Sequence, residues 1–153
     1  MRIEQSFTVG APPDRVWSLI RDPQIMVGCV PGCDGIEQID ETSYTAQVTV
    51  SVGPIKARFN LVIEITEEQA PTLIRTESRG EEGSRASMVK SVNEMRLTPV
   101  DEGTEVSYSA DVEISGRLGR YGAGMMKKIA TKLAGKFEES FRTLAEAPEE
   151  VAG

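Results

Sequence analysis

The strongest constraint on the fold of this chain is one long helical pattern near its end, from Gly116 to about Ala147. Apolar residues recur there at steps of three and four, which is the period of one helical face. A helix of about 30 residues is a rod of roughly 45 Å, so the rest of the chain must cover a long apolar stripe. The stripe consists of Leu118, Gly122, Met125, Met126, Ile129, Leu133, Phe137, Phe141 and Leu144.

Most of the remaining chain alternates between apolar and polar residues, which is typical of strands with one buried face. Two short helices are expected after the first strand, one beginning at 11–14 and ending at Asp22, and one from Gln24 to Val27. Every connection between strands is short, which predicts an antiparallel sheet. The expected strands cover residues 2–9, a short segment around Ile36 and Ile39, and then 44–52, 55–65, 72–79, 85–98 and 105–115.

These elements predict an α+β fold in which a seven-stranded, curved antiparallel sheet wraps around a long C-terminal helix, with two short helices after the first strand. A chain of 153 residues suits one domain with its own core. We expect a single domain over residues 1–147, followed by a short frayed tail at 148–153.

Composition excludes several classes of function. The net charge of −7 argues against nucleic acid as a partner, because a phosphate backbone would be repelled. The chain has no histidine, which removes the usual general base and the commonest metal ligand. Cys29 and Cys33 lack the C-x-x-C spacing, and two thiols alone cannot complete a zinc site. We therefore expect no catalytic residues, no metal site and no covalently bound cofactor.

A basic segment stands out in this acidic chain. Between Arg117 and Lys136 there are six basic residues and no acidic one. One interpretation is a solvated helix face, and the other is a docking surface for an acidic partner or an anionic membrane. The absence of an apolar signal region or membrane-length apolar run predicts a cytoplasmic protein, peripheral to the inner membrane at most. The expected docking residues are Arg120, Lys127, Lys128 and Lys132.

Small residues on both sides of the interior predict a cavity between helix and sheet. Gly119 and Gly122 fall on the apolar stripe, and the strands offer small inward residues opposite them, so a guest would fit near the start of the helix. The alternative is that the glycines only allow close contact between helix and sheet. The expected ligand-binding residues are Trp17, Met26, Val30, Phe59, Leu61, Asn93, Met95, Tyr108, Leu118, Gly122, Met125 and Ile129.

Two polar side chains are expected inside this cavity. Asn93 and Tyr108, with Ser91 next, could donate hydrogen bonds to a ligand carbonyl, although Tyr108 could equally be a core ring bonded to the backbone. Asn93 points inward only if its neighbour Val92 points outward. The mouth is expected where four turns gather at one end of the sheet, at residues 28–34, 51–54, 80–84 and 115–119.

Several motifs, in order along nearly the whole chain, resemble the CoxG family, which is named for a subunit of carbon monoxide dehydrogenase and belongs to the SRPBCC superfamily of START and Bet v 1-like proteins. The resemblance implies a helix-grip fold and a non-catalytic accessory protein. Many members carry a longer C-terminal extension, often ending in an apolar anchor, whereas this sequence stops at Gly153. Stable membrane anchoring is therefore not implied by the resemblance. The motifs are Phe7-x-Val9, Ala-Pro-Pro-Asp-Arg-Val-Trp at 11–17, Asp22-Pro23, Cys29-Val-Pro-Gly-Cys33, Val-Gly-Pro-Ile-Lys-Ala-Arg-Phe at 52–59, Gly103-Thr104 and Gly116-Arg-Leu-Gly119.

The resemblance also implies a partner and a ligand. Its members accompany molybdenum-containing carbon monoxide dehydrogenases and related hydroxylases, and are associated with their membrane recruitment or maturation or with carrying a quinone. We therefore expect a carrier for a quinone or lipid-like molecule that serves such a hydroxylase. Two alternatives are an enzyme similar to polyketide cyclases and dehydratases that depends on Tyr108, and an interaction module that docks through the basic helix face.

Overall fold

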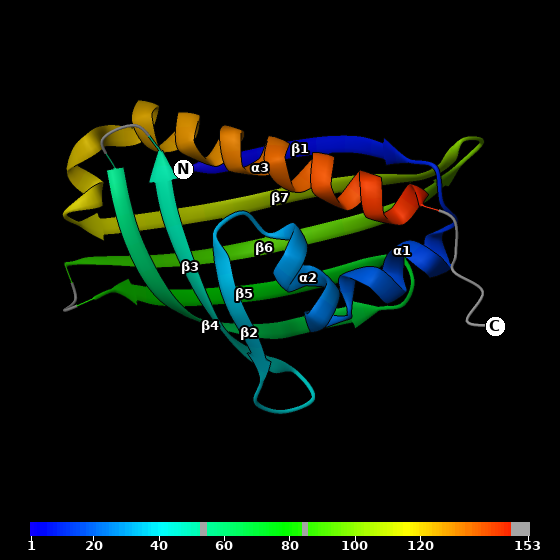
Figure 1. Ribbon diagram of the computed structural model, residues 1–153, viewed down its shortest axis with the longest axis horizontal. Coiled ribbons are helices and arrows are strands. Elements are labelled where there is room, and N and C mark those ends of the chain that lie inside the picture. Colours follow the sequence, from blue (N-terminus) through cyan, green and yellow to red (C-terminus); the bar gives the residue numbers. More distant parts are fainter. Residues whose placement is uncertain (53–54, 84–85, 148–153) are drawn as a thin grey trace.

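Seven antiparallel strands form a single curved sheet that wraps around one long helix, as Figure 1 shows. The strands are β1 (Arg2–Val9), β2 (Cys33–Gln38), β3 (Ser43–Val52), β4 (Ile55–Gln69), β5 (Leu73–Glu82), β6 (Ser87–Val100) and β7 (Gly103–Gly116). This computed structural model describes residues 1–52, 55–83 and 86–147. The strand order is β1-β7-β6-β5-β4-β3-β2, so β1 and β2 are the two edges of the sheet.

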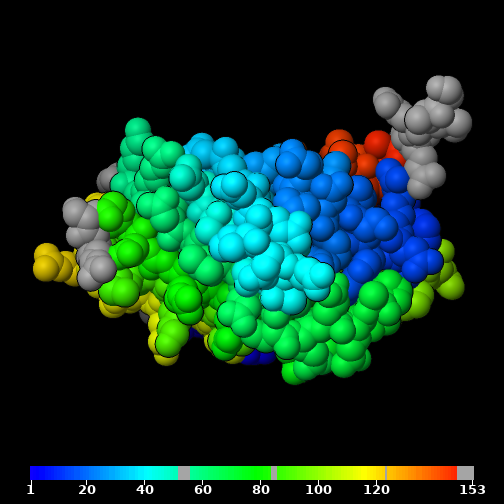
Figure 2. Space-filling view, turned by 90° about the horizontal axis from the view of Figure 1, so that it is seen from below, coloured from blue at the N-terminus to red at the C-terminus, as the bar shows by residue number. Residues whose placement is uncertain are grey.

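The helices are α1 (Pro13–Ile20), α2 (Pro23–Cys29), the 3-10 turn η1 (Leu118–Tyr121) and the long α3 (Gly122–Glu146). The two short helices follow β1 and pack on the same face of the sheet as α3. Figure 2 shows the side of the molecule on which the β2–β3 hairpin lies next to the two short helices. This arrangement confirms the predicted α+β helix-grip architecture. The expected tail at 148–153 lies outside the described residues.

Proline and aspartate set the starts of the two short helices. Pro13 occupies the first turn of α1, where no backbone N–H is needed. Asp22 caps α2, because its carboxylate accepts a hydrogen bond from the Gln24 backbone N–H at 3.0 Å. The prediction that α2 stops at Gly28 is wrong, since the Val30 N–H still donates to a carbonyl of that helix at 3.0 Å.

Strands β4 and β5 end later than the sequence pattern predicts. The predicted strands stop at residues 65 and 79, whereas β4 continues to Gln69 and β5 to Glu82. A β-bulge allows β4 to go on after its alternating part ends. Gly80 lies within β5, where a side chain would overlap the Asn60 carbonyl, so this glycine permits close approach between strands instead of a turn.

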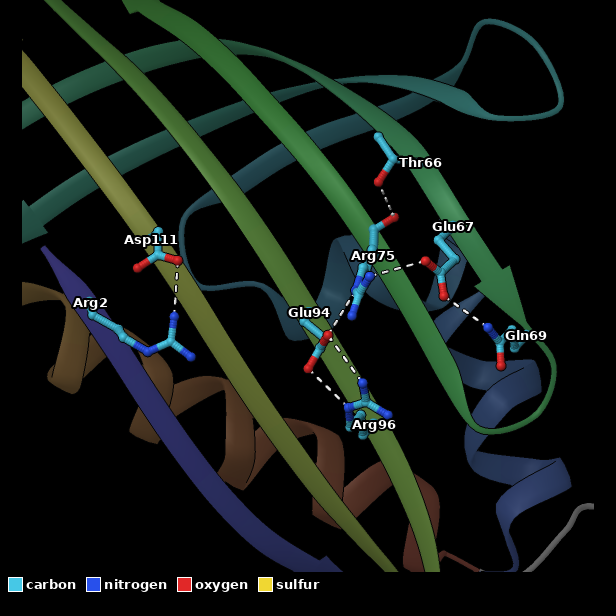
Figure 3. A network of polar contacts seen from close by, with 8 residues as sticks. All are labelled: Arg2, Thr66, Glu67, Gln69, Arg75, Glu94, Arg96 and Asp111. Atoms are coloured by element: carbon cyan, nitrogen blue, oxygen red, sulfur yellow. Dashed lines mark hydrogen bonds and ion pairs between the residues drawn. The ribbon is translucent and has the colours of Figure 1, made fainter.

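The outer face of the sheet carries charged pairs between neighbouring strands, on the side away from α3 (Figure 3). Arg75 lies 3.0 Å from Glu67 and 2.8 Å from Glu94, and Arg96 lies 2.9 Å from Glu94. Hydrogen bonds from Arg96 and then Arg75 lower the pKa of Glu94. Exposed pairs of this kind contribute at most about 1 kcal/mol each, so they favour the strand register more than overall stability.

Polar side chains fasten α3 to the edge strand β1. Gln5 donates to the Glu138 carboxylate at 3.1 Å and to the Ala134 carbonyl at 3.4 Å. Arg142 donates to the Thr8 backbone carbonyl at 3.1 Å. The helix therefore runs beside β1 while its apolar face meets the sheet (Figure 1).

Two apolar clusters hold the two ends of α3. Near its C-terminal end Phe141 is fully buried and stacks on Phe137, with ring centroids 5.5 Å apart. This end packs against α1 and the strands β1, β6 and β7. Near the N-terminal end the cluster consists of Leu118, Met126 and Ile129 from the helical segment, and Ala57 and Phe59 from β4.

The helical pattern does not form one continuous helix, and the prediction of a single helix from Gly116 is wrong. The chain first makes the short turn η1, and Gly122 then has a φ of 81°. Residues with a side chain rarely adopt this conformation, whereas glycine does so at little cost. The periodicity read from the sequence therefore changes phase at Gly122.

A buried carboxylate anchors the start of this segment. Glu82 is only 9% exposed, forms an ion pair with Arg117 and accepts a hydrogen bond from the Ser87 hydroxyl at 2.7 Å. The Ser87 oxygen in turn accepts from the Leu118 backbone N–H at 3.0 Å. Hydrogen bonds from Arg117 and from Ser87 lower the pKa of Glu82, although burial opposes this shift.

The Glu82 cluster predicts a pH-dependent stability. A carboxylate whose pKa is lowered by folding stabilises the protein above its unfolded-state pKa, and loses that effect as the pH falls through its folded-state pKa. Glu82→Gln is expected to lower the free energy of unfolding by about 1–3 kcal/mol at neutral pH. The difference should shrink below about pH 4. Urea unfolding at several pH values measures it, with Glu77→Gln on the exposed face of β5 as control. An equal loss at neutral and acid pH would contradict this account.

Candidate functional site

Two apolar hollows adjoin each other between the sheet and the helices. The sheet chamber, of about 220 Å³, is enclosed mainly by strands and α2. The helix chamber, of about 370 Å³, lies between β1, α2 and the middle of α3. Together they reach the size range of small-molecule sites. The apolar wall of the sheet chamber includes Ile36, Ile63, Ile65 and Ile74, and that of the helix chamber Ile3, Phe7, Ala130, Leu133, Ala134 and Phe137.

Four residues line both chambers and form a waist between them. They are Met26 and Val30 from α2 and its C-cap, Met95 from β6 and Tyr108 from β7. Methionine side chains are flexible and polarisable, so they adapt to guests of different shape. The waist residues belong to the walls of both chambers, so the two hollows lie directly next to each other.

A polar cluster lies at the sheet-chamber side of the waist. The Asn93 amide nitrogen is 3.2 Å from the hydroxyls of Thr76 and Ser91 and 3.4 Å from that of Ser78. The Tyr108 hydroxyl donates to the Asn93 side-chain oxygen at 3.3 Å. Asn93 therefore faces inward, as the predicted parity of β6 requires. Its neighbour Val92 lies on the outer face and is exposed.

The environment of Tyr108 defines what its hydroxyl can do. Burial raises the pKa of Tyr108. Its phenol therefore stays neutral over the physiological range and acts as a hydrogen-bonding group, since a neutral phenol is a poor base. Its partner is a side chain and not the backbone, in contrast to the alternative stated for Tyr108 above.

A second polar pair in the sheet chamber was not expected from the sequence. Arg21, at the end of α1, donates to the Tyr44 hydroxyl on β3 at 2.7 Å, and its Nε lies 2.6 Å from the Glu68 carboxylate. Tyr44 shares the inward parity of Ala46, so the alternation of β3 could have found it. Arg21 carries no such signal, because it follows the last residue of a short helix.

The structure corrects the expected position of the cavity. Gly122 and Met125 do not face the interior: Gly122 is exposed and Met125 is 37% exposed. Gly119 is also at the surface. The room beneath the helix comes instead from Ala130 and Ala134, one to three turns further along α3. The change of phase at the start of α3 explains the error.

Five other expected lining residues belong to the packed core. Leu118 and Ile129 join Phe59 in the cluster that fills the N-terminal end of the helix, and Leu61 packs against that cluster. Trp17 packs against the clusters on both sides of α1. None of the five lines either chamber. Of the expected set, the residues brought together at the cavity are Met26, Val30, Asn93, Met95 and Tyr108.

The predicted mouth is only partly supported. Val30 and Pro31, from the turn after α2, line the helix chamber. The segment 115–119 does not reach it, because its one buried side chain belongs to the packed end of the helix. The other two turns include residues 53–54 and residue 84, which lie outside the described part of the chain.

The basic segment begins at η1 and continues along the exposed side of α3. Within the described residues its cations form no ion pair apart from Arg117, and the apolar side chains of Tyr121 (40% exposed) and Met125 lie among them. None of the described helices has the length and apolar character needed to cross a membrane. The expected docking residues Arg120, Lys127, Lys128 and Lys132 are all exposed.

The other hollows and reactive side chains among the described residues are weaker candidates for a functional site. A larger hollow of about 860 Å³ lies along β2 to β5, but its lining includes the charged Glu37, Arg79 and Glu81, which suits an apolar guest poorly. Both cysteines are reduced, with Cys29 buried and Cys33 partly buried, and burial raises the pKa of each thiol. Raised thiol pKa values make both cysteines poor nucleophiles.

Comparison with solved structures places this fold among known ones. A conserved protein from Geobacillus kaustophilus is 25% identical, with a TM-score of 0.88 over 95% of each chain. A START superfamily protein from Mycobacterium smegmatis is 14% identical, with a TM-score of 0.77 over 95% of this chain and 97% of that one. Ara h 8.0201 is also 14% identical, with a TM-score of 0.65 over 95% of this chain and 97% of that one.

Comparison with sequences identifies the family. No curated protein sequence matches the chain. The profile of the CoxG family, named for a subunit of carbon monoxide dehydrogenase, matches residues 6–146, which include the waist and all of α3. This match spans nearly the whole chain, and the fold agrees with it. The chain therefore belongs to the CoxG family of carbon monoxide dehydrogenase subunits.

Proposed function

We propose that this protein is a non-catalytic carrier that binds an apolar small molecule across the two chambers and serves a carbon monoxide dehydrogenase-type hydroxylase. The observation that carries the proposal is the pair of apolar hollows, which lie next to each other and share the four residues of the waist. The Asn93 cluster and the Arg21–Tyr44 pair lie in the sheet chamber, whereas the polar residues that line the helix chamber are Gln5 and Tyr108. This distribution suits a molecule with a polar head and an apolar tail.

The ligand we propose is a quinone or a lipid-like molecule. A quinone ring has two uncharged carbonyl oxygens, and the hydroxyl groups that line the sheet chamber are suited to them. An isoprenoid or acyl tail would extend past Met26 and Met95 into the helix chamber. A carrier of this kind would deliver the electron acceptor to a molybdenum-containing partner, or support its recruitment or maturation.

A carrier fits the residues better than a cyclase or dehydratase does. Such an enzyme would need a group that takes or gives a proton at the substrate. Tyr108 is kept neutral by burial and its hydrogen is engaged by Asn93. In a carrier Tyr108→Phe should weaken binding, whereas in an enzyme it would abolish turnover.

Organic extraction of the purified protein followed by mass spectrometry tests the proposal directly. We expect an apolar molecule with an oxygen-bearing head to be recovered in proportion to the protein. If none is found, titration with an isoprenoid quinone should still show saturable uptake. Absence of both a bound molecule and quinone uptake would refute the carrier function.

The helix chamber predicts a dependence on tail length. Ala134→Phe places a ring in the space beneath α3, so affinity for a quinone with an isoprenoid tail should fall at least about tenfold, the equivalent of about 1.4 kcal/mol. Affinity for the same ring without a tail should stay within about twofold. Thr131→Phe is the matched control, because it adds an equal ring on the exposed side of the same helix. Equal losses for both quinones would contradict a tail in this chamber.

The basic face of α3 supports a docking role beside ligand binding. Its cations are free of ion pairs within the described residues, and two exposed apolar side chains accompany them, which suits an acidic partner or an anionic membrane surface. We propose that Arg120, Lys127, Lys128 and Lys132 make this transient contact.

Charge reversal separates docking from binding. Replacing Lys127, Lys128 and Lys132 by Glu should abolish salt-sensitive binding to the hydroxylase or to anionic vesicles, because attraction becomes repulsion. Quinone uptake should be unchanged, since these side chains lie outside the chambers. Reversal of three basic residues on the outer face of the sheet is the control for net charge. Unchanged docking in the reversed protein would exclude this face.

A further inference from the structure

The polar groups around the chambers differ in whether their hydrogen-bond donors are already engaged. The Tyr108 hydroxyl donates to Asn93 at 3.3 Å. The two amide hydrogens of Asn93 are shared among three hydroxyls at 3.2–3.4 Å. A ligand that used either group as a donor would first have to break an existing contact, which cancels most of the gain.

Tyr44 is different, because its hydroxyl is engaged only as an acceptor. The residue is 8% exposed and lies in an apolar cluster with Ile65 and Ile74. Its oxygen accepts a hydrogen bond from Arg21 at 2.7 Å, and no described residue accepts its own hydrogen. Both residues line the sheet chamber. A hydroxyl that accepts from a cation becomes a stronger donor, and low polarity around it strengthens the effect.

The surrounding charges determine which acceptor this donor fits. Arg21 is already balanced by the Glu68 carboxylate at 2.6 Å, with a quarter of the arginine side chain exposed. An anionic head group would be repelled by Glu68, so the pair favours an uncharged acceptor such as a carbonyl oxygen. Thr76 also lines the chamber with a hydroxyl hydrogen to donate, but no cation polarises it.

We infer that the Tyr44 hydroxyl, polarised by Arg21, donates the hydrogen bond that selects an uncharged carbonyl group on a ligand in the sheet chamber. This inference rests on the proposed carrier function and names the residue that recognises the polar head group of the ligand. Arg21 acts as a positioning residue, because it holds the phenol oxygen without needing to touch the ligand. The Asn93 cluster then shapes and fixes the neighbouring wall.

A matched pair of probes tests this assignment on the full chain. Benzophenone and diphenylmethane share their two rings and differ in a carbonyl against a methylene group. Calorimetric titration should show that the wild-type protein binds the ketone about tenfold more tightly, the effect of one charge-assisted hydrogen bond. Tyr44→Phe should remove this preference and keep the affinity for diphenylmethane, because the ring remains in place. Arg21→Met should reduce the preference in part.

The controls distinguish failure of the inference from failure of the proposed function. Tyr121→Phe makes the same chemical change at an exposed phenol and should keep the preference. A tenfold preference that survives Tyr44→Phe, or that is lost only in Thr76→Val, overturns the inference. Equal wild-type affinities for both probes overturn it too and leave the carrier function standing. If the wild type binds neither probe, the inference fails, whereas the carrier function fails only if extraction and quinone titration are negative as well.

Discussion

The structure depends on how α3 packs against the sheet. Large apolar side chains pack at both ends of the helix, and small ones lie in its middle. Phe141 is fully buried at one end, and Leu118, Met126 and Ile129 fill the other. Between these clusters the helix presents the small side chains of Ala130 and Ala134 to the hollow. Since the ends fix the distance between helix and sheet, the middle cannot collapse, and a hollow follows from the same packing that stabilises the fold.

The fold was largely predictable because it follows from two periodicities. The period of two determined the inward parity of β6, and with it the position of Asn93, from the sequence alone. The period of a helix assumes a continuous helix, so it failed at Gly122, whose backbone conformation resets the phase. That single error displaced the expected cavity towards the packed end. The pairing of Arg21 with Tyr44 joins residues 23 positions apart, which no local pattern encodes.

The polar groups of the interior form two sets with different chemistry. The Asn93 set engages the side-chain amide of Asn93 and the Tyr108 hydroxyl within the protein, so it adds rigidity to the wall of the cavity. The Arg21–Tyr44–Glu68 set joins α1 to β3 and β4 and, among the described residues, leaves one hydroxyl hydrogen directed at no protein acceptor. A carrier needs both properties, because its cavity must stay open when empty and still recognise one end of its guest.

The contacts between α3 and β1 have a consequence for solubility. A hollow protein buries less apolar surface than a filled one of equal size, so its edges open more readily. The unpaired backbone carbonyls of an edge strand can accept hydrogen bonds from a strand of another chain, and such pairing leads to aggregation. Arg142 occupies the Thr8 carbonyl, and Gln5 ties the same strand to the helix. The helix that covers the helix chamber therefore also opposes self-association along the β1 edge of the sheet.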